Sequence, residues 1–157
     1  MSVADDLMAY LTPQLGKEVH VGPWLTIDQE RIDRFAEVTG DVQWIHIDPE
    51  RARRESLFGA TIAHGYLTLS LLPFLTESNH PDFFQKNYPG MRMRVNYGLD
   101  RVRFPAPVIV GSRIRARTVI KDAAKTGDGV QIVYLITVEI EGKEKPACVA
   151  EFIARVY

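Results

Sequence analysis

The stretch TIAHGYLTLSLLPFL, residues 61–75, is apolar at almost every position. A helix of this composition has no polar face to turn toward water, so it should be surrounded by protein. The stretch is shorter than the ~20 apolar residues that a membrane span requires, and Pro73 would kink or end a helix there. Residues 61–75 therefore predict a long central helix buried in the domain.

The sequence after this helix changes to a period of two, which is typical of β-strands. Residues 92–104 alternate but change phase near Gly98, which indicates a bulge or break. Residues 113–120 alternate regularly, with arginines on one face, so one face of this strand should be exposed to solvent. Two further strands are predicted over Val130–Ile140 and Ala147–Tyr157, with the turn sequences KTGDG and EGKEK before and between them.

Residues before the central helix predict a short strand and two helices. Val19–Ile27 has the pattern of a strand, and Asp28 can cap a helix over Gln29–Val38. The sequence PERARRE, residues 49–55, begins with a proline where a second, short helix would start. Together with the later strands, these elements predict a single α+β domain over residues 1–157, in which a curled antiparallel sheet wraps around the central helix.

Composition and charge exclude several classes of function. The 19 basic and 20 acidic side chains give a formal charge of −1, which argues against a broad grip on nucleic acid or anionic lipid. Asp5 and Asp6 stand where a secretory signal would carry lysine or arginine, so we expect a cytoplasmic protein. The only cysteine, Cys148, should be a buried small hydrophobe, and the scattered histidines show no metal-ligand spacing, so no metal is expected.

The sequence TGDVQWIH, residues 39–46, places a carboxylate and an imidazole close together after the helix predicted over Gln29–Val38. On one α-helix Asp41 and His46 would lie about 140° apart, so they can meet only across a turn. Gly40 supplies the flexible residue where such a turn would begin. Taken alone, each residue more often has a structural role, but a carboxylate and an imidazole that converge are suited to proton transfer near neutral pH.

Gly65 lies in the first turn of the predicted central helix, where backbone N–H groups lack intrahelical partners. Such an amide can polarise a carbonyl oxygen, although a glycine here would equally allow close helix–sheet contact. An acid–base pair with an oxyanion donor, and without a nucleophile or metal, suits addition or removal of water beside an activated carbonyl.

The two segments resemble the MaoC-like dehydratases and (R)-specific enoyl-CoA hydratases, whose signature runs Gly-Asp-x-Asn-Pro-aliphatic-His. The signature stands here as GDVQWIH, residues 40–46, and the similarity continues through IHIDPERA into IAHGYLTLSLL. With the strand order included, it covers most of the chain from about Gly16 to the C-terminus. The resemblance implies the hot-dog fold, an acyl thioester substrate carried on coenzyme A or acyl carrier protein, no other cofactor, and a dimer.

The resemblance also implies roles for individual residues. Asp41 and His46 would hold and activate a water, and the Gly65 amide would receive the thioester oxygen. The implied reaction interconverts a trans-2-enoyl thioester and the (R)-3-hydroxyacyl thioester. Two alternatives stay open, namely a thioesterase of the same fold and a non-catalytic module that binds acyl thioesters.

This sequence departs from the family signature at several positions. Gln43 and Trp44 replace Asn-Pro beside the predicted water site, a variant that resembles the nodulation protein N-like branch. Both are candidate substrate-binding residues, although a tryptophan is more often part of a core. Hydratases of the family tend to place a serine where this chain has Pro73, and Ser70 is a candidate substitute.

Two further expectations concern partners. Val133 and Leu135 make the strand predicted over Val130–Ile140 apolar on both faces, as in a central strand or at a subunit contact, and we expect a homodimer. A contact to the pyrophosphate of coenzyme A should come from one of four arginines. These are Arg92, Arg94, Arg101 and Arg103.

Overall fold

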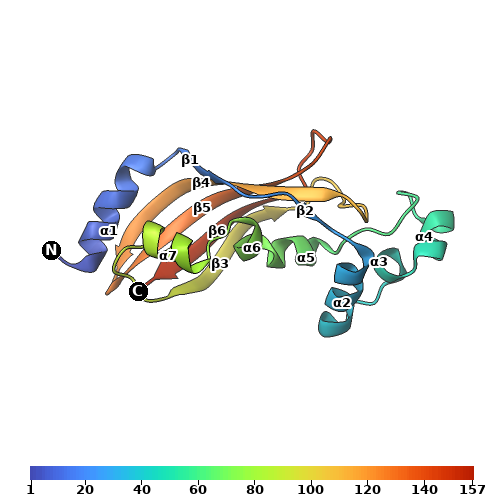
Figure 1. Cartoon of the computed structure of the whole chain (residues 1–157), viewed down its shortest axis with the longest axis horizontal. Coiled ribbons are helices and arrows are strands. Elements are labelled where there is room, and N and C mark those ends of the chain that lie inside the picture. Colours follow the sequence, from blue (N-terminus) through green and yellow to red (C-terminus); the bar gives the residue numbers. More distant parts are fainter.

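A single curved antiparallel sheet is the framework of the molecule, as Figure 1 shows. The computed structural model describes residues 1–157. The strand order is β1-β4-β5-β6-β3, and β2 pairs with β4. The strands are β1 (Glu18–Val21), β2 (Leu25–Thr26), β3 (Arg94–Arg103), β4 (Arg113–Thr126), β5 (Gly129–Ile140) and β6 (Cys148–Val156).

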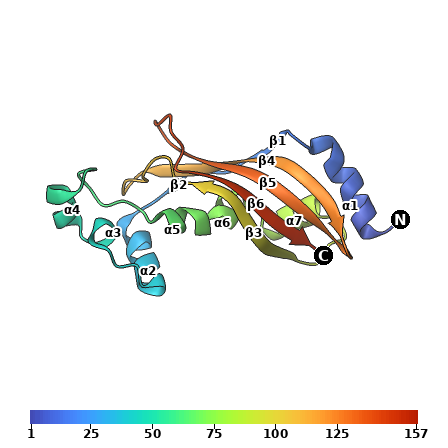
Figure 2. The same ribbon diagram turned by 180° about the vertical axis from the view of Figure 1, so that it is seen from behind.

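The predicted central helix lies along the concave side of the sheet but is shorter than expected (Figures 1 and 2). It consists of α5 (Gly65–Ser70) and α6 (Leu72–Leu75), which meet at Leu71. Pro73 lies in the first turn of α6, where backbone N–H groups have no intrahelical acceptor, so the missing N–H of proline is tolerated. A new helix therefore begins here instead of α5 continuing.

The sequence predicted that protein would surround the helical segment on every side. The structure shows instead that one side is uncovered. Leu67, Leu72 and Leu75 are buried against the sheet. Tyr66 and Phe74 are 70% and 56% exposed and point away from it. An exposed aromatic pair on an otherwise apolar helix marks a face that this chain alone leaves uncovered.

The strand predictions are confirmed in their main features. β5 lies between β4 and β6, so the central-strand reading of residues 130–140 is correct. β3 pairs with β6 through two register shifts, and the first falls between Asn96 and Gly98, where the alternation changes phase. The strand predicted over Val19–Ile27 is broken into β1 and β2 by Gly22, Pro23 and Trp24, since a proline cannot donate to the ladder.

Three helices project beyond one end of the sheet (Figures 1 and 2). These are α2 (Gln29–Thr39), α3 (Trp44–Ile47) and α4 (Pro49–Glu55). Asp28 caps α2 by accepting a hydrogen bond from Arg31 N–H at 2.9 Å, as predicted, and Asp48 caps α4 in the same way. At the other end lie α1 (Val3–Leu11) and α7 (Pro81–Asn87), which the sequence analysis did not predict. A 3₁₀ turn, η1 (Thr12–Gln14), follows α1.

Cys148 is fully buried, as predicted, and burial raises the pKa of its thiol to about 11. None of the helices combines the length and the apolar character needed to cross a bilayer.

Candidate active site

The predicted turn between Asp41 and His46 forms as expected. α2 ends at Gly40, whose φ of 80° is left-handed and favours glycine. The chain then runs through a short loop, residues 40–43, into α3. Ligand atoms of Asp41, His46 and His64 all lie within 4.8 Å of one another. The sequence therefore correctly predicted that Asp41 and His46 converge.

His46 is held in one orientation by the backbone. Its side chain is buried, and Nδ1 donates to the carbonyl of Ile62 at 2.7 Å. The proton therefore resides on Nδ1, and Nε2 carries the lone pair. Burial lowers the pKa of His46 below its ordinary value of 6.5, and the nearby His64 acts in the same direction, whereas the Ile62 hydrogen bond and Asp41 oppose the shift. The imidazole is therefore neutral at pH 7 and can accept a proton.

The structure adds His64 to the site, a residue that the sequence analysis did not name as a candidate. Its ring is stacked on His46, with 3.8 Å between centroids and 24° between planes. Its Nε2 donates to the backbone carbonyl of Asp41 at 2.9 Å. The sequence did not reveal this contact, because the two histidines are 18 residues apart and only the tertiary fold brings residue 64 beside α3.

Asp41, His46 and His64 together offer three potential metal ligands, a grouping that the argument from spacing missed. Their geometry is a poor fit to a chelate. Imidazole lone pairs lie in the ring plane, and two stacked rings direct these lone pairs side by side instead of toward one point. The arrangement better fits proton transfer by one ring supported by the other.

Gly65 presents a free amide beside these rings. It is the first residue of α5, directly after His64, and its N–H has no backbone acceptor. A Cβ at this position would lie 3.0 Å from the ring of Phe104, so the missing side chain permits that close packing. Gly65 and Phe104 both line an open groove of about 460 Å³. The groove is mostly apolar and within the usual size range of small-molecule sites.

Comparison with known proteins places this site in a family. Residues 11–142 match the family described as the MaoC like domain. The chain belongs to the MaoC-like dehydratase family. Its fold is therefore the predicted hot-dog fold, here with an open sheet.

Named relatives of this MaoC-like chain include two groups of bacterial proteins. It is 50% identical over 155 residues to 3-hydroxyacyl-thioester dehydratase Z of Mycobacterium tuberculosis, an alignment that covers 98% of this chain and 95% of the relative. It is 45% identical to nodulation protein N of Rhizobium leguminosarum bv. viciae over 93% of this chain and 88% of the relative. The match to nodulation protein N agrees with the branch expected from Gln43 and Trp44.

A solved structure confirms the fold independently. The (R)-hydratase from A. caviae involved in PHA biosynthesis superimposes with a TM-score of 0.64 at 22% identity, covering 87% of this chain and 96% of the hydratase. At this identity the likeness concerns the fold alone.

The two residues that depart from the MaoC-like signature lie at the start of α3. Gln43 is exposed, and its side chain makes no capping hydrogen bond. Trp44 is half-buried, outside the hydrophobic core, with the Arg51 guanidinium 4.4 Å above its ring. Trp44 is therefore not part of the hydrophobic core, and its role in substrate binding stays a prediction.

Ser70 does not take over the role of the missing serine within this chain. It is the last residue of α5, about 7.5 Å along the helix axis from Gly65. Its hydroxyl donates to the Tyr66 carbonyl at 2.7 Å. Together with Pro73 it lines a different groove, between the helical segment and β3.

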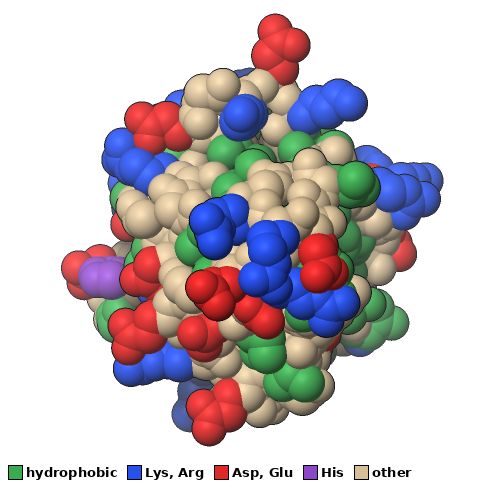
Figure 3. All heavy atoms as spheres, turned by 90° about the vertical axis from the view of Figure 1, so that its right-hand side faces the viewer, with side chains coloured by type: hydrophobic (Ala, Val, Ile, Leu, Met, Phe, Trp, Pro, Cys, Tyr) green, Lys and Arg blue, Asp and Glu red, His purple; other side chains and the backbone are tan.

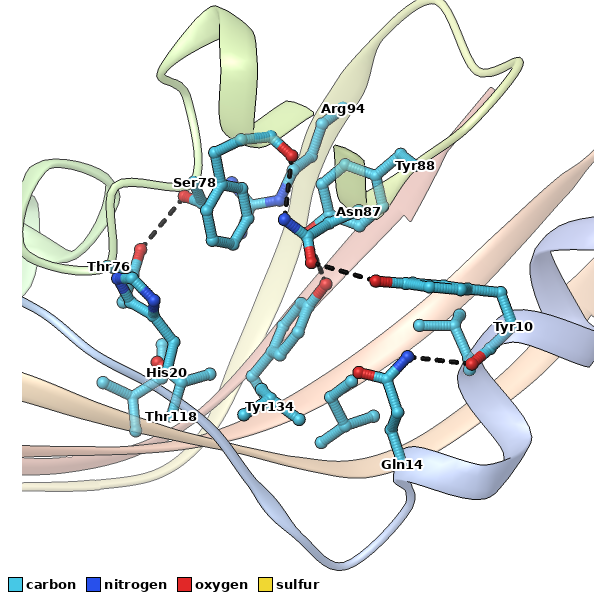
Figure 4. A pocket seen from close by; sticks show the side chains of 15 residues that line it. Tyr10, Gln14, His20, Thr76, Ser78, Asn87, Tyr88, Arg94, Thr118 and Tyr134 are labelled. Atoms are coloured by element: carbon cyan, nitrogen blue, oxygen red, sulfur yellow. Dashed lines mark hydrogen bonds between the residues drawn. The ribbon is translucent and has the colours of Figure 1, made fainter. Parts of the chain in front are cut away.

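A separate cavity with both polar and apolar lining residues lies at the opposite end of the sheet, between α1, α7 and the strands (Figure 4). The hydroxyls of Tyr88 and Tyr134 share a hydrogen bond of 2.5 Å there, and Tyr10 donates to Asn87 at 3.4 Å. With a volume of about 30 Å³ it holds one or two waters and no acyl chain. Its lining comes from α1, η1, α7 and the nearby strands, so it belongs to the packing at this end of the sheet.

Charges near the site carry both signs. Figure 3 shows the end of the molecule that bears α2, α3 and α4, where acidic and basic side chains are both present. The mixture of signs on this face (Figure 3) agrees with the prediction, made from the formal charge of −1, that the protein has no broad nucleic-acid surface.

Proposed function

We propose that this MaoC-like chain is a hydro-lyase that interconverts trans-2-enoyl thioesters and (R)-3-hydroxyacyl thioesters. One observation carries the proposal. A carboxylate and a neutral imidazole converge next to His64, and the following residue, Gly65, has an unpaired backbone N–H and lines an apolar groove. The name of the relative that is 50% identical, 3-hydroxyacyl-thioester dehydratase Z, supports the same reaction.

The geometry assigns a role to each group. Asp41 and the Nε2 face of His46 hold one water between them. In the hydration direction, the water oxygen bonds to C3, a proton is delivered to C2, and the atoms of one water are added across the double bond. The negative charge that develops on the thioester oxygen is stabilised by the Gly65 N–H, which stands at the start of α5 with no other partner.

The carrier of the acyl group is coenzyme A or acyl carrier protein, and the reaction needs no other cofactor. Two of the four candidate arginines are already engaged. Arg94 lies over the ring of Phe152 at 4.8 Å, and Arg101 pairs with the buried carboxylate of Glu151 at 2.7 Å. Arg92 and Arg103 make no ion pair, so they remain the candidates for a phosphate contact.

Product analysis tests the proposed reaction. Crotonyl and longer enoyl thioesters are offered on both carriers. Hydration removes the enoyl absorbance and leaves the carrier attached, whereas a thioesterase would release a thiol that a disulfide reagent detects. Binding without turnover of any chain length would instead support a non-catalytic binding module.

We also propose that the active form is a homodimer that pairs through β3. β3 is an edge strand, and Val95, Tyr97 and Leu99 on it are 44%, 56% and 40% exposed. The groove between β3 and the helical segment adds further apolar surface. Long apolar edges are rarely left open in monomers, because they template pairing with another chain. We therefore expect the dimer contact at the edge strand β3. The sequence analysis based the dimer on the apolar strand β5 instead, but β5 lies in the middle of the sheet.

Light scattering should give about twice the chain mass of 17.8 kDa. Val95→Lys should reduce it to the single-chain mass, because a lysine on an edge strand opposes pairing. Val38→Lys is the matched control, since Val38 is an exposed valine on α2, away from β3. A wild-type chain that stays monomeric at micromolar concentration would rule out the dimer.

Trp44→Ala should shift the preferred acyl chain toward greater length, because it removes a large ring from the entrance of the site. The loss of stability should be well below the ~3–5 kcal/mol of a buried aromatic-to-alanine change, since Trp44 is only half-buried. Trp24→Ala is a close control, because Trp24 is also half-buried with an arginine, Arg115, 4.3 Å over its ring. An unchanged chain-length profile in Trp44→Ala would contradict a role at the substrate path.

A further inference from the structure

We propose that His64 is a positioning residue, whose Nε2–H holds the Asp41 carbonyl and thereby fixes the Asp41 carboxylate relative to His46 and the Gly65 amide. The inference deepens the proposed function and rests on it. His64 donates to Asp41 across 23 residues of sequence, at 2.9 Å. The hydrogen bond joins the loop that carries the carboxylate to the start of the helix that carries the oxyanion donor.

The loop of residues 40–43 has little else to hold it in place. Gly40 N–H bonds to Ala36, Val42 N–H to Gly40, and Gln43 N–H approaches the Asp41 carboxylate at 3.5 Å, all within four residues. The bond from His64 is the only one that ties this loop to a distant part of the chain. All four loop residues are exposed, so burial does not order the loop either.

His64 is itself rigidly held. Its side chain is 2% exposed and lies between two rings, Phe35 of α2 at 4.9 Å and His46 of α3 at 3.8 Å. The preceding residue, Ala63, is fixed to the sheet side by a hydrogen bond from its N–H to the Val108 carbonyl at 2.8 Å. A ring packed in this way has one rotamer available, which makes it a stable anchor for the loop.

The tautomer and the burial of His64 limit the residue to positioning Asp41 and exclude direct proton transfer to the substrate. A carbonyl only accepts, so the proton must lie on Nε2. The other nitrogen, Nδ1, is buried and has no hydrogen-bond partner. Neither nitrogen therefore reaches solvent or substrate, and His64 acts through Asp41 and His46 instead of on the reacting atoms.

Two substitutions separate the hydrogen bond from the packing. His64→Gln keeps an N–H donor at about the position of Nε2 but loses the aromatic ring. His64→Phe keeps a ring between Phe35 and His46 but loses the donor. His80→Gln is the matched control, because His80 is exposed and outside the site.

His64→Phe should lower kcat by about 10- to 100-fold and change KM less than about threefold. The reason is that a misplaced Asp41 carboxylate slows the chemical step much more than it weakens substrate binding. His64→Gln should restore most of that loss, and His80→Gln should match the wild type. A folded His64→Phe protein with wild-type kcat would overturn the proposal, as would a His64→Gln protein as impaired as His64→Phe at equal melting temperature.

Amide hydrogen exchange tests the same link without any turnover. Exchange at Val42 and Gln43 should speed up by about tenfold or more in His64→Phe and stay close to wild type in His64→Gln. Unchanged exchange in His64→Phe would show that the bond does not order the loop. If the wild-type chain failed to hydrate any enoyl thioester, the proposed function would fall, while the exchange measurement would still decide whether His64 holds Asp41.

Discussion

Asp41→Asn and His46→Gln should each lower kcat by about 10²–10⁴-fold with limited change in KM, because each removes a proton-transfer group and keeps approximate size and hydrogen-bonding capacity. Both proteins should fold. Asp41 is exposed, so an amide there needs no buried partner, and a glutamine at 46 fills much of the volume of the buried imidazole. The measurement is loss of enoyl absorbance, run beside thermal unfolding of each variant.

The double variant tests whether the two groups act on one water. Groups that serve the same step are far from additive, so the double variant should be little worse than the poorer single one. Two independent residues would instead multiply their losses. Near-normal kcat in a folded single variant would remove that residue from the mechanism.

Gly65→Pro should lower kcat by about 10²–10³-fold, because it removes the proposed oxyanion donor. The substitution is unusually well suited to this position. Gly65 is the first residue of α5, where proline is favoured, and the ψ of 136° at His64 is the extended conformation that a residue before proline prefers. The helix should therefore survive the loss of the N–H.

Gly65→Ala is the control for the added side-chain atoms. It keeps the N–H but places a Cβ 3.0 Å from the Phe104 ring, which is 40% exposed and has room to shift. Its kcat should stay within about tenfold of the wild type. If Gly65→Pro and Gly65→Ala had the same kcat at similar melting temperatures, the Gly65 amide would not be the donor.

Local patterns were sufficient for much of this fold. The alternation over residues 113–120 and 130–140 predicts strands because side chains of a strand point to opposite faces whatever lies nearby. Asp28 and Asp48 mark helix starts because a capping side chain bonds within its own first turn. The meeting of Asp41 and His46 also follows from local geometry, since five residues around a glycine turn can bring them together.

Features that depend on contacts between distant segments could not be predicted from local sequence patterns. α1 and α7 were missed although local signals mark their starts, a capping box of Ser2 and Asp5 at α1 and Pro81 at the first position of α7, so distant contacts do not account for these two omissions. The helix over residues 61–75 was expected to be continuous and fully covered, but the chain breaks at Leu71 and leaves Tyr66 and Phe74 exposed. An apolar sequence indicates that a helix should be shielded from water. It does not indicate whether the same chain or a partner subunit provides the shielding surface.

By itself, the sequence determined the meeting of Asp41 with His46, the helix-start glycine, the order of strands along the chain and the family. Only the tertiary structure decided the spatial strand order, the exposed edge at β3 and the position of His64. The physical reason is that a hydrogen bond such as that between His64 and Asp41 joins residues 23 apart, and its geometry exists only after α2, α3 and α5 have packed against one another. The meeting of the carboxylate with the imidazole is therefore encoded locally, whereas the fixed orientation of the two groups is a property of the folded chain.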